Sequence, residues 1–211
     1  MASQRERQRL RHLIAAEAVR LLSEGGLSSV DAARRKAAQR YGCADQRQWP
    51  EPAEVAAAWA ERQRLFAAPG VVDHLQRLRR IARDVMALFA ELDPELTDGL
   101  ATGIADAHTP IWIRLHADAP EQVVFRLLDR RIPWQESERR LLFGAGRREA
   151  RPAFRLRADG AEVELVVLRP ADRADPPRDP GTGRPAPGVG LAELGTLLAT
   201  TGPQPRSASG T

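Results

Sequence analysis

The hydrophobic period of the chain changes at Asp93-Pro94, and this change constrains the fold more than any other feature of the sequence. After it, Ile111, Ile113 and Leu115 alternate with polar or amphipathic neighbours, which predicts a β-strand over 111–116. Before it, the apolar residues of 72–92 recur at the i, i+3, i+4 and i+7 spacing of an amphipathic helix: Leu75, Leu78, Ile81, Val85, Leu88, Phe89 and Leu92. Helices followed by strands predict an α+β fold.

Further elements follow from the same patterns and from the positions of Gly and Pro. Helices are expected over about 3–23, 30–42, 53–67 and 120–129. Short strands are expected at 133–134, 141–143, 154–157 and 163–168, with hairpin turns at Gly144–Gly146 and Asp159-Gly160. With 111–116 they predict a mixed sheet of about four strands.

Three regions are expected along the chain. Residues 1–70 form an N-terminal helical region, and residues 71–170 form the α+β domain. Residues 171–211 read as a Pro/Gly-rich tail, because a segment with so few apolar residues cannot bury enough surface to order itself. A short helix over 191–198 is expected within this tail.

Composition narrows the classes of protein. The 211 residues are long enough for an ordinary hydrophobic core, and 43% of them are hydrophobic. The single cysteine, Cys43, makes no internal disulfide and predicts a reducing, cytoplasmic location. Apolar runs are far shorter than the roughly 20 residues that cross a bilayer, so no membrane partner is expected.

Positive charge is concentrated in the front half of the chain. Residues 1–92 hold 16 Arg and Lys against 11 Asp and Glu. The densest cluster lies on the second expected helix, at Arg34, Arg35, Lys36 and Arg40, and a basic helix face predicts a nucleic-acid partner. Lys36 is the only lysine, and this preference for Arg is also typical of a G+C-rich genome.

One segment carries a motif. Gly99 and Gly103 lie in a small-residue turn, and His108-Thr109 precede the strand 111–116. This order of helix, glycine turn and strand resembles the nucleotidyltransferase superfamily, which has the DNA polymerase β-like fold. In that family the turn brings backbone N–H groups to phosphates, and two carboxylates on the strand hold Mg²⁺. The resemblance implies a ligand cleft at Gly99, Gly103, His108, Thr109, Trp112 and Arg114.

The carboxylates of that motif are missing. Pro110 and Trp112 occupy the two positions, and neither residue ligates a metal. The third carboxylate of such folds corresponds to Glu162 or Glu164, which also read as the solvent side of an edge strand. No metal site and no cofactor are therefore expected.

The resulting hypothesis is a nucleotidyltransferase-like protein that has lost catalysis and binds a nucleotide, RNA or a protein partner. A basic helical module that binds nucleic acid is the alternative. A third hypothesis is an active nucleotidyltransferase that holds Mg²⁺ through Asp106, Asp118 and Glu164, although the first two lie at opposite ends of the strand. The sequence leaves the oligomeric state open.

Overall fold

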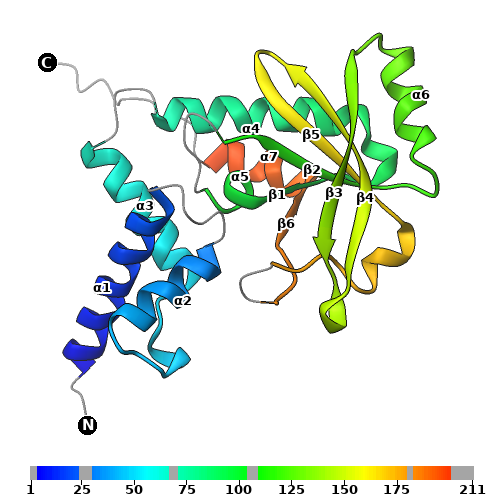
Figure 1. Ribbon diagram of the computed structural model, residues 1–211. Helices are drawn as coiled ribbons and strands as arrows, with labels where there is room; N and C mark the ends of the chain where they lie inside the picture. The colour runs from blue at the N-terminus through cyan, green and yellow to red at the C-terminus, as the bar shows by residue number, and fades with distance from the viewer. Residues whose placement is uncertain (1–3, 24–29, 67–70, 104–108, 180–182, 201–211) are drawn as a thin grey trace, which may run out of the picture.

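The computed structural model describes residues 4–23, 30–66, 71–103, 109–179 and 183–200. Across these ranges the chain forms a helical group followed by a six-stranded mixed sheet with packed helices. Figure 1 shows the first three helices as a group beside the sheet. The predicted α+β class, with helices first and strands after, is confirmed.

The N-terminal group has its own hydrophobic core. It consists of α1 (Gln4–Ser23), α2 (Val30–Arg40), the 3₁₀ turn η1 (Gln46–Gln48) and α3 (Pro52–Phe66). Ile14 of α1, Val55 and Trp59 of α3, and the small Ala33 and Ala37 of α2 are buried together. The alanines let α1 and α2 approach closely, which leaves the long polar side chains on the outside.

In the sheet, the first and the last strand along the chain lie side by side. Its order is β3-β4-β5-β2-β1-β6, and only β2 and β5 run parallel. The strands are β1 (Glu95–Thr97), β2 (Ile111–His116), β3 (Trp134–Leu142), β4 (Arg148–Ala158), β5 (Ala161–Leu168) and β6 (Gly188–Gly190). The tight turn at Asp159 and Gly160, both with positive φ, joins β4 to β5 as a hairpin.

One face of the sheet is covered by α4 (Val71–Leu88) and α7 (Leu191–Thr200), as Figure 1 shows. Alternate residues of β2 and β5 point into this layer, including Ile113 and Leu165, which are fully buried. This confirms the expectation that the helix over 72–92 packs against a sheet containing both strands. The helix ends at Leu88 and is followed by the 3₁₀ turn η2 (Ala90–Leu92).

The other face of the sheet is mixed. A small apolar cluster of Phe143, Ala153, Val166 and Leu168 covers one end of it. The remaining elements are α5 (Asp98–Thr102), α6 (Glu121–Asp129), η3 (Gly144–Gly146) and η4 (Pro170–Arg173). Trp112 on β2 faces this side, at the opposite end from the cluster.

Four expectations differ from the structure. The sheet has six strands instead of about four, and β5, which carries Glu162 and Glu164, lies between β4 and β2 instead of at an edge. The segments 133–134 and 141–143 are the ends of one strand, β3, whose middle residues are polar because β3 is an edge strand with no layer over it. The region after residue 170 is also more ordered than its composition predicts over 171–179 and 183–200. Val189 of β6 and Leu194 of α7 are buried in the main core, and they hold this segment to the sheet.

No helix within these described ranges is both long enough and apolar enough to cross a membrane.

Candidate functional site

A groove of about 730 Å³ lies where β2 and β5 begin. Parallel strands begin at the same edge of a sheet, and alternation gives neighbouring strands matching faces. Trp112 and Glu164 are direct register partners in this pair. The lining residues are Pro110, Trp112, Pro133, Trp134, Gln135, Arg139, Arg155, Leu156, Arg157, Glu162, Val163 and Glu164.

The floor of the groove is a compact arrangement of an indole, a carboxylate and two guanidinium groups. The Arg139 guanidinium lies 3.6 Å from the centroid of the Trp112 ring. Its Nη1 donates to Oε2 of Glu164 at 2.5 Å, while Nε of Arg155 donates to Oε1 of the same carboxylate at 3.1 Å. The Glu164 side chain is only 9% exposed, whereas that of Arg155 is 63% exposed.

This arrangement decides what Glu164 can do. Both of its carboxylate oxygens already accept hydrogen bonds from arginine, so a metal ion would have to displace two cations to reach them. Glu162 is exposed and pairs in register with Arg157 on β4. In the part of the chain that the structure describes, no group of three or more His, Cys, Asp or Glu side chains could hold a metal ion.

Asp98 is a residue near the groove that the sequence reasoning did not single out. It begins α5 with φ of 60°, is half-buried, and accepts a hydrogen bond from the hydroxyl of Thr97. Burial raises the pKa of Asp98, and the nearby cations Arg139 and Arg114 oppose that rise. In the sequence, only its position directly before Gly99 of the turn could have indicated that Asp98 lies near the site.

The ligand cleft implied by the resemblance is only partly assembled. Trp112 lines the groove, and Thr109 lies half-buried one residue before its rim at Pro110. Gly99 lies in α5, and Gly103 ends that helix with φ of 81°. Neither glycine is among the described residues that line the groove. His108 and Asp106 lie outside the described residues.

Arg114 has a structural position instead of the expected place in the cleft. Its side chain is 8% exposed, forms an ion pair with Glu95 at 3.0 Å, and donates to the carbonyl of Ala186 at 3.2 Å. Burial lowers the pKa of Arg114, and Glu95 opposes this effect. The guanidinium therefore joins β2 to the segment leading into β6, away from the groove.

The basic cluster of α2 is also divided by the structure. Arg34 is buried, forms an ion pair with Asp31 and donates to the carbonyl of Pro50 at 2.6 Å. Arg40 forms an ion pair with Glu17 of α1. These contacts hold the helical group together. Arg34 was expected to contact nucleic acid, but its buried guanidinium is not available to a phosphate. Arg35 and Lys36 are exposed.

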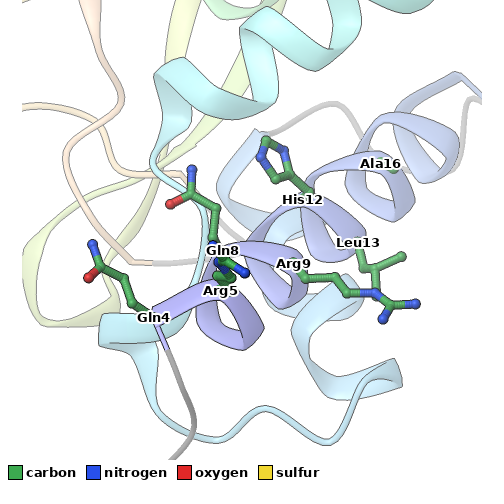
Figure 2. Close-up of a pocket in the computed structure, with 7 residues that line it drawn as sticks. All are labelled: Gln4, Arg5, Gln8, Arg9, His12, Leu13 and Ala16. Carbon is green, nitrogen blue, oxygen red and sulfur yellow. The ribbon is translucent and has the colours of Figure 1, made fainter.

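A more continuous polar and basic surface lies on α1. Its residues are Gln4, Arg5, Gln8, Arg9, His12, Leu13 and Ala16, and Figure 2 shows that all of them come from this one helix. They recur at i and i+4, so they share one side of α1, opposite the buried Ile14 and Ala18.

Comparison of the chain with protein-family models, with curated proteins and with solved structures finds no match.

Proposed function

We propose that the protein binds a nucleotide in the groove beside Trp112 and does not transfer it. The observation that supports this most directly is the Arg139 guanidinium, stacked on Trp112 and bridged to Glu164. In a nucleotidyltransferase-like fold this is the place where carboxylates would hold Mg²⁺. A fixed cation here attracts phosphate without requiring a metal ion.

The composition of the groove favours a nucleotide over other anions. Its volume of about 730 Å³ lies within the range of small-molecule sites. Trp112, one face of which is covered by Arg139, and Trp134, which also packs against the main core, line the groove and offer their remaining aromatic surface to a base. Arg155 and Arg157 offer exposed guanidinium groups to phosphates. Stacking combined with cation contacts is the usual chemistry of nucleotide recognition without sequence readout.

Two observations argue against catalysis through Mg²⁺. Pro110 and Trp112 supply no ligand, and both oxygens of Glu164 are engaged by arginine. The alternative set of Asp118 and Glu164 is separated, because Asp118 follows the far end of β2 and lines a different groove. Without paired carboxylates, the charge that develops in nucleotidyl transfer has no metal to neutralise it.

The test is calorimetric titration of the full chain with ATP, GTP, CTP and UTP, once with EDTA and once with Mg²⁺. We expect binding that Mg²⁺ does not tighten, and no transfer of labelled nucleotide to RNA or protein. Arg155→Ala should weaken binding, while Arg148→Ala should not, because Arg148 is exposed at the opposite end of the same strand. Metal-dependent transfer that Glu164→Gln abolishes would establish an active enzyme instead.

A second candidate function, nucleic-acid binding by the helical group, is favoured by the α1 surface. Arg5, Arg9 and His12 lie on one side of that helix among amide side chains that can also contact phosphates. Binding of RNA by this surface should fall steeply as salt rises from about 50 to 200 mM, because each neutralised phosphate releases counterions. Arg5→Ala with Arg9→Ala should reduce that slope, and exposed Arg62→Ala on α3 is the control. A salt-independent affinity excludes this mechanism.

A further inference from the structure

We propose that Arg139 is the main phosphate-binding group of the groove and that its ligand is a nucleoside di- or triphosphate rather than a monophosphate. This inference rests on the proposed function and deepens it. It assigns to one side chain the role that a divalent cation would otherwise fill.

The guanidinium of Arg139 is held in one place by two different contacts. The Trp112 ring supports its flat face at 3.6 Å, and Glu164 binds one of its edges. An arginine side chain normally loses considerable rotamer entropy when it binds a ligand, but here that entropy is already lost. Arg139 is thus organised for binding before a ligand arrives.

Arg139 still has donors to offer. A guanidinium carries five N–H groups, and within the described residues only one of those on Arg139 has a hydrogen-bond partner. The side chain is 27% exposed and lines the groove. This side chain is less exposed than that of Arg155, and partial burial strengthens the attraction of its remaining N–H groups for an anion.

The spacing of the arginines favours more than one phosphate. Arg139 and Arg155 bind the two oxygens of the same Glu164 carboxylate, so their guanidinium groups lie close enough to be bridged by a single phosphate group. Arg157 lies two residues further along the same face of β4, or about 7 Å. A second phosphate of the same ligand can reach Arg157, and a monophosphate cannot reach both places.

The net charge of the groove is compatible with binding a ligand that carries two or three phosphates. Arg139 and Arg155 together exceed Glu164 by one positive charge, while Arg157 and Glu162 are register partners of opposite sign. Lysine would not be equivalent at position 139, because an ammonium group neither stacks flat on an indole nor presents a planar fork of donors.

The experiment measures the Kd of AMP, ADP and ATP by calorimetry in EDTA, with the wild-type full chain and three variants. The wild type should bind ADP and ATP more tightly than AMP. Arg139→Met should weaken ADP and ATP binding by roughly tenfold to a hundredfold, the usual effect of removing a charge-assisted hydrogen bond. Arg157→Ala should reduce the difference between ATP and AMP, and Arg148→Ala should change neither.

Arg139→Lys keeps the charge and serves as a second variant, should Arg139→Met fail to fold by circular dichroism. It should weaken ATP binding at least about fivefold, because stacking and the donor fork are lost. Wild-type protein that binds no nucleotide in EDTA or in Mg²⁺ refutes the proposed function itself. Wild-type binding in EDTA that persists unchanged in both Arg139 variants refutes only the role of Arg139.

Discussion

Arg151 and Asp172 form the most buried ion pair on the face of the sheet that carries the groove. Nε and Nη2 of Arg151 donate to the two carboxylate oxygens at 3.0 and 3.1 Å, and both residues are nearly inaccessible. Arg169 donates to the same carboxylate through its backbone and side chain. Burial raises the pKa of Asp172, but the hydrogen bonds from Arg151 and Arg169 outweigh burial and hold the pKa at about 2.

This pair makes stability depend on pH in a defined direction. Because the pKa of Asp172 is lower in the folded chain than its ordinary value of 3.8, its contribution is complete above about pH 4 and is lost as pH falls toward 2. Asp172→Asn should cost about 3 kcal/mol of unfolding free energy at pH 7, because the buried Arg151 guanidinium loses its buried carboxylate partner and keeps only its ion pair with Glu149. Urea unfolding at pH 7, 4 and 2.5 measures this.

The difference between wild type and Asp172→Asn should shrink between pH 4 and pH 2.5. Asp84→Asn is the matched control, because Asp84 is 67% exposed and, among the residues that the structure describes, pairs only with its neighbour Arg83. We expect that variant to lie within about 0.5 kcal/mol of wild type at each pH. A cost of Asp172→Asn that is the same at all three pH values contradicts the titration of this carboxyl.

Sequence reasoning identified some members of the groove and could not identify others. Trp112 and Glu164 were singled out by the resemblance to the nucleotidyltransferase motif, and the alternation of their strands fixes the face on which each side chain lies. Arg139 was missed, because its importance depends on the alignment of β3 with β4 and of β4 with β5. A run such as Glu138-Arg139-Arg140 gives no register, since polar residues occupy both sides of an edge strand.

At the scale of elements, β6 is a short strand whose first residue has little room. A Cβ at Gly188 would come within 2.9 Å of Oε2 of Glu95 and closer still to the Arg114 guanidinium. Those two side chains form an ion pair in which Arg114 is buried and Glu95 is partly exposed, so an added Cβ would require both of them to shift. The absence of a side chain at Gly188 therefore permits β6 to lie beside β1.

Gly188→Ala should destabilise the protein by about 1 to 3 kcal/mol, as is usual when a packed site receives an extra methyl group. Gly190→Ala is the control, because nothing lies within 4 Å of a Cβ there, although both residues belong to the same strand. Thermal melting of both variants measures the difference. Equal melting temperatures of the two variants would show that Arg114 moves aside at no cost in stability, and that the pairing of β6 with β1 does not require glycine at position 188.

Periodicity predicted the long elements and failed for the short ones. The helix α4 and the strands β2 and β5 each present a regular apolar stripe, so their existence and their packing followed from the sequence. β1 and β6 have three residues each and show no period. The composition around Pro176 to Gly190 indicated disorder, but the few apolar residues of β6 and α7 are enough to anchor them.

At the scale of the whole molecule, the described buried residues form one cluster within α1–α3, a larger one between the sheet, α4 and α7, and a small third one on the opposite face of the sheet. The chain passes from the first to the second between α3 and α4 (Figure 1). A segment with its own hydrophobic core can fold as a unit. We infer that the sheet and its two helices do not require the helical group.

A chain beginning at residue 71 should therefore fold without α1–α3. Circular dichroism with a single cooperative thermal transition, and a dispersed amide spectrum by NMR, are the expected results. Loss of a cooperative transition in this fragment contradicts the inference. In the same fragment, nucleotide binding should persist, and RNA binding through α1 should disappear.

The order in which the strands lie in the sheet has a consequence for how the chain reaches this structure. Ile111 of β2 pairs with Val163 of β5, and Glu95 of β1 pairs with Gly190 of β6, so neither partnership can form from neighbouring residues. Contacts of such long range fold slowly, because a large loop must close before any contact is gained. While the chain emerges from the ribosome, β1 and β2 are synthesised long before β6 and β5, the strands that pair with their outer edges. The unpaired backbone of β1 remains exposed until the last strand arrives, so a chain stopped before Gly188 keeps an open edge that favours aggregation.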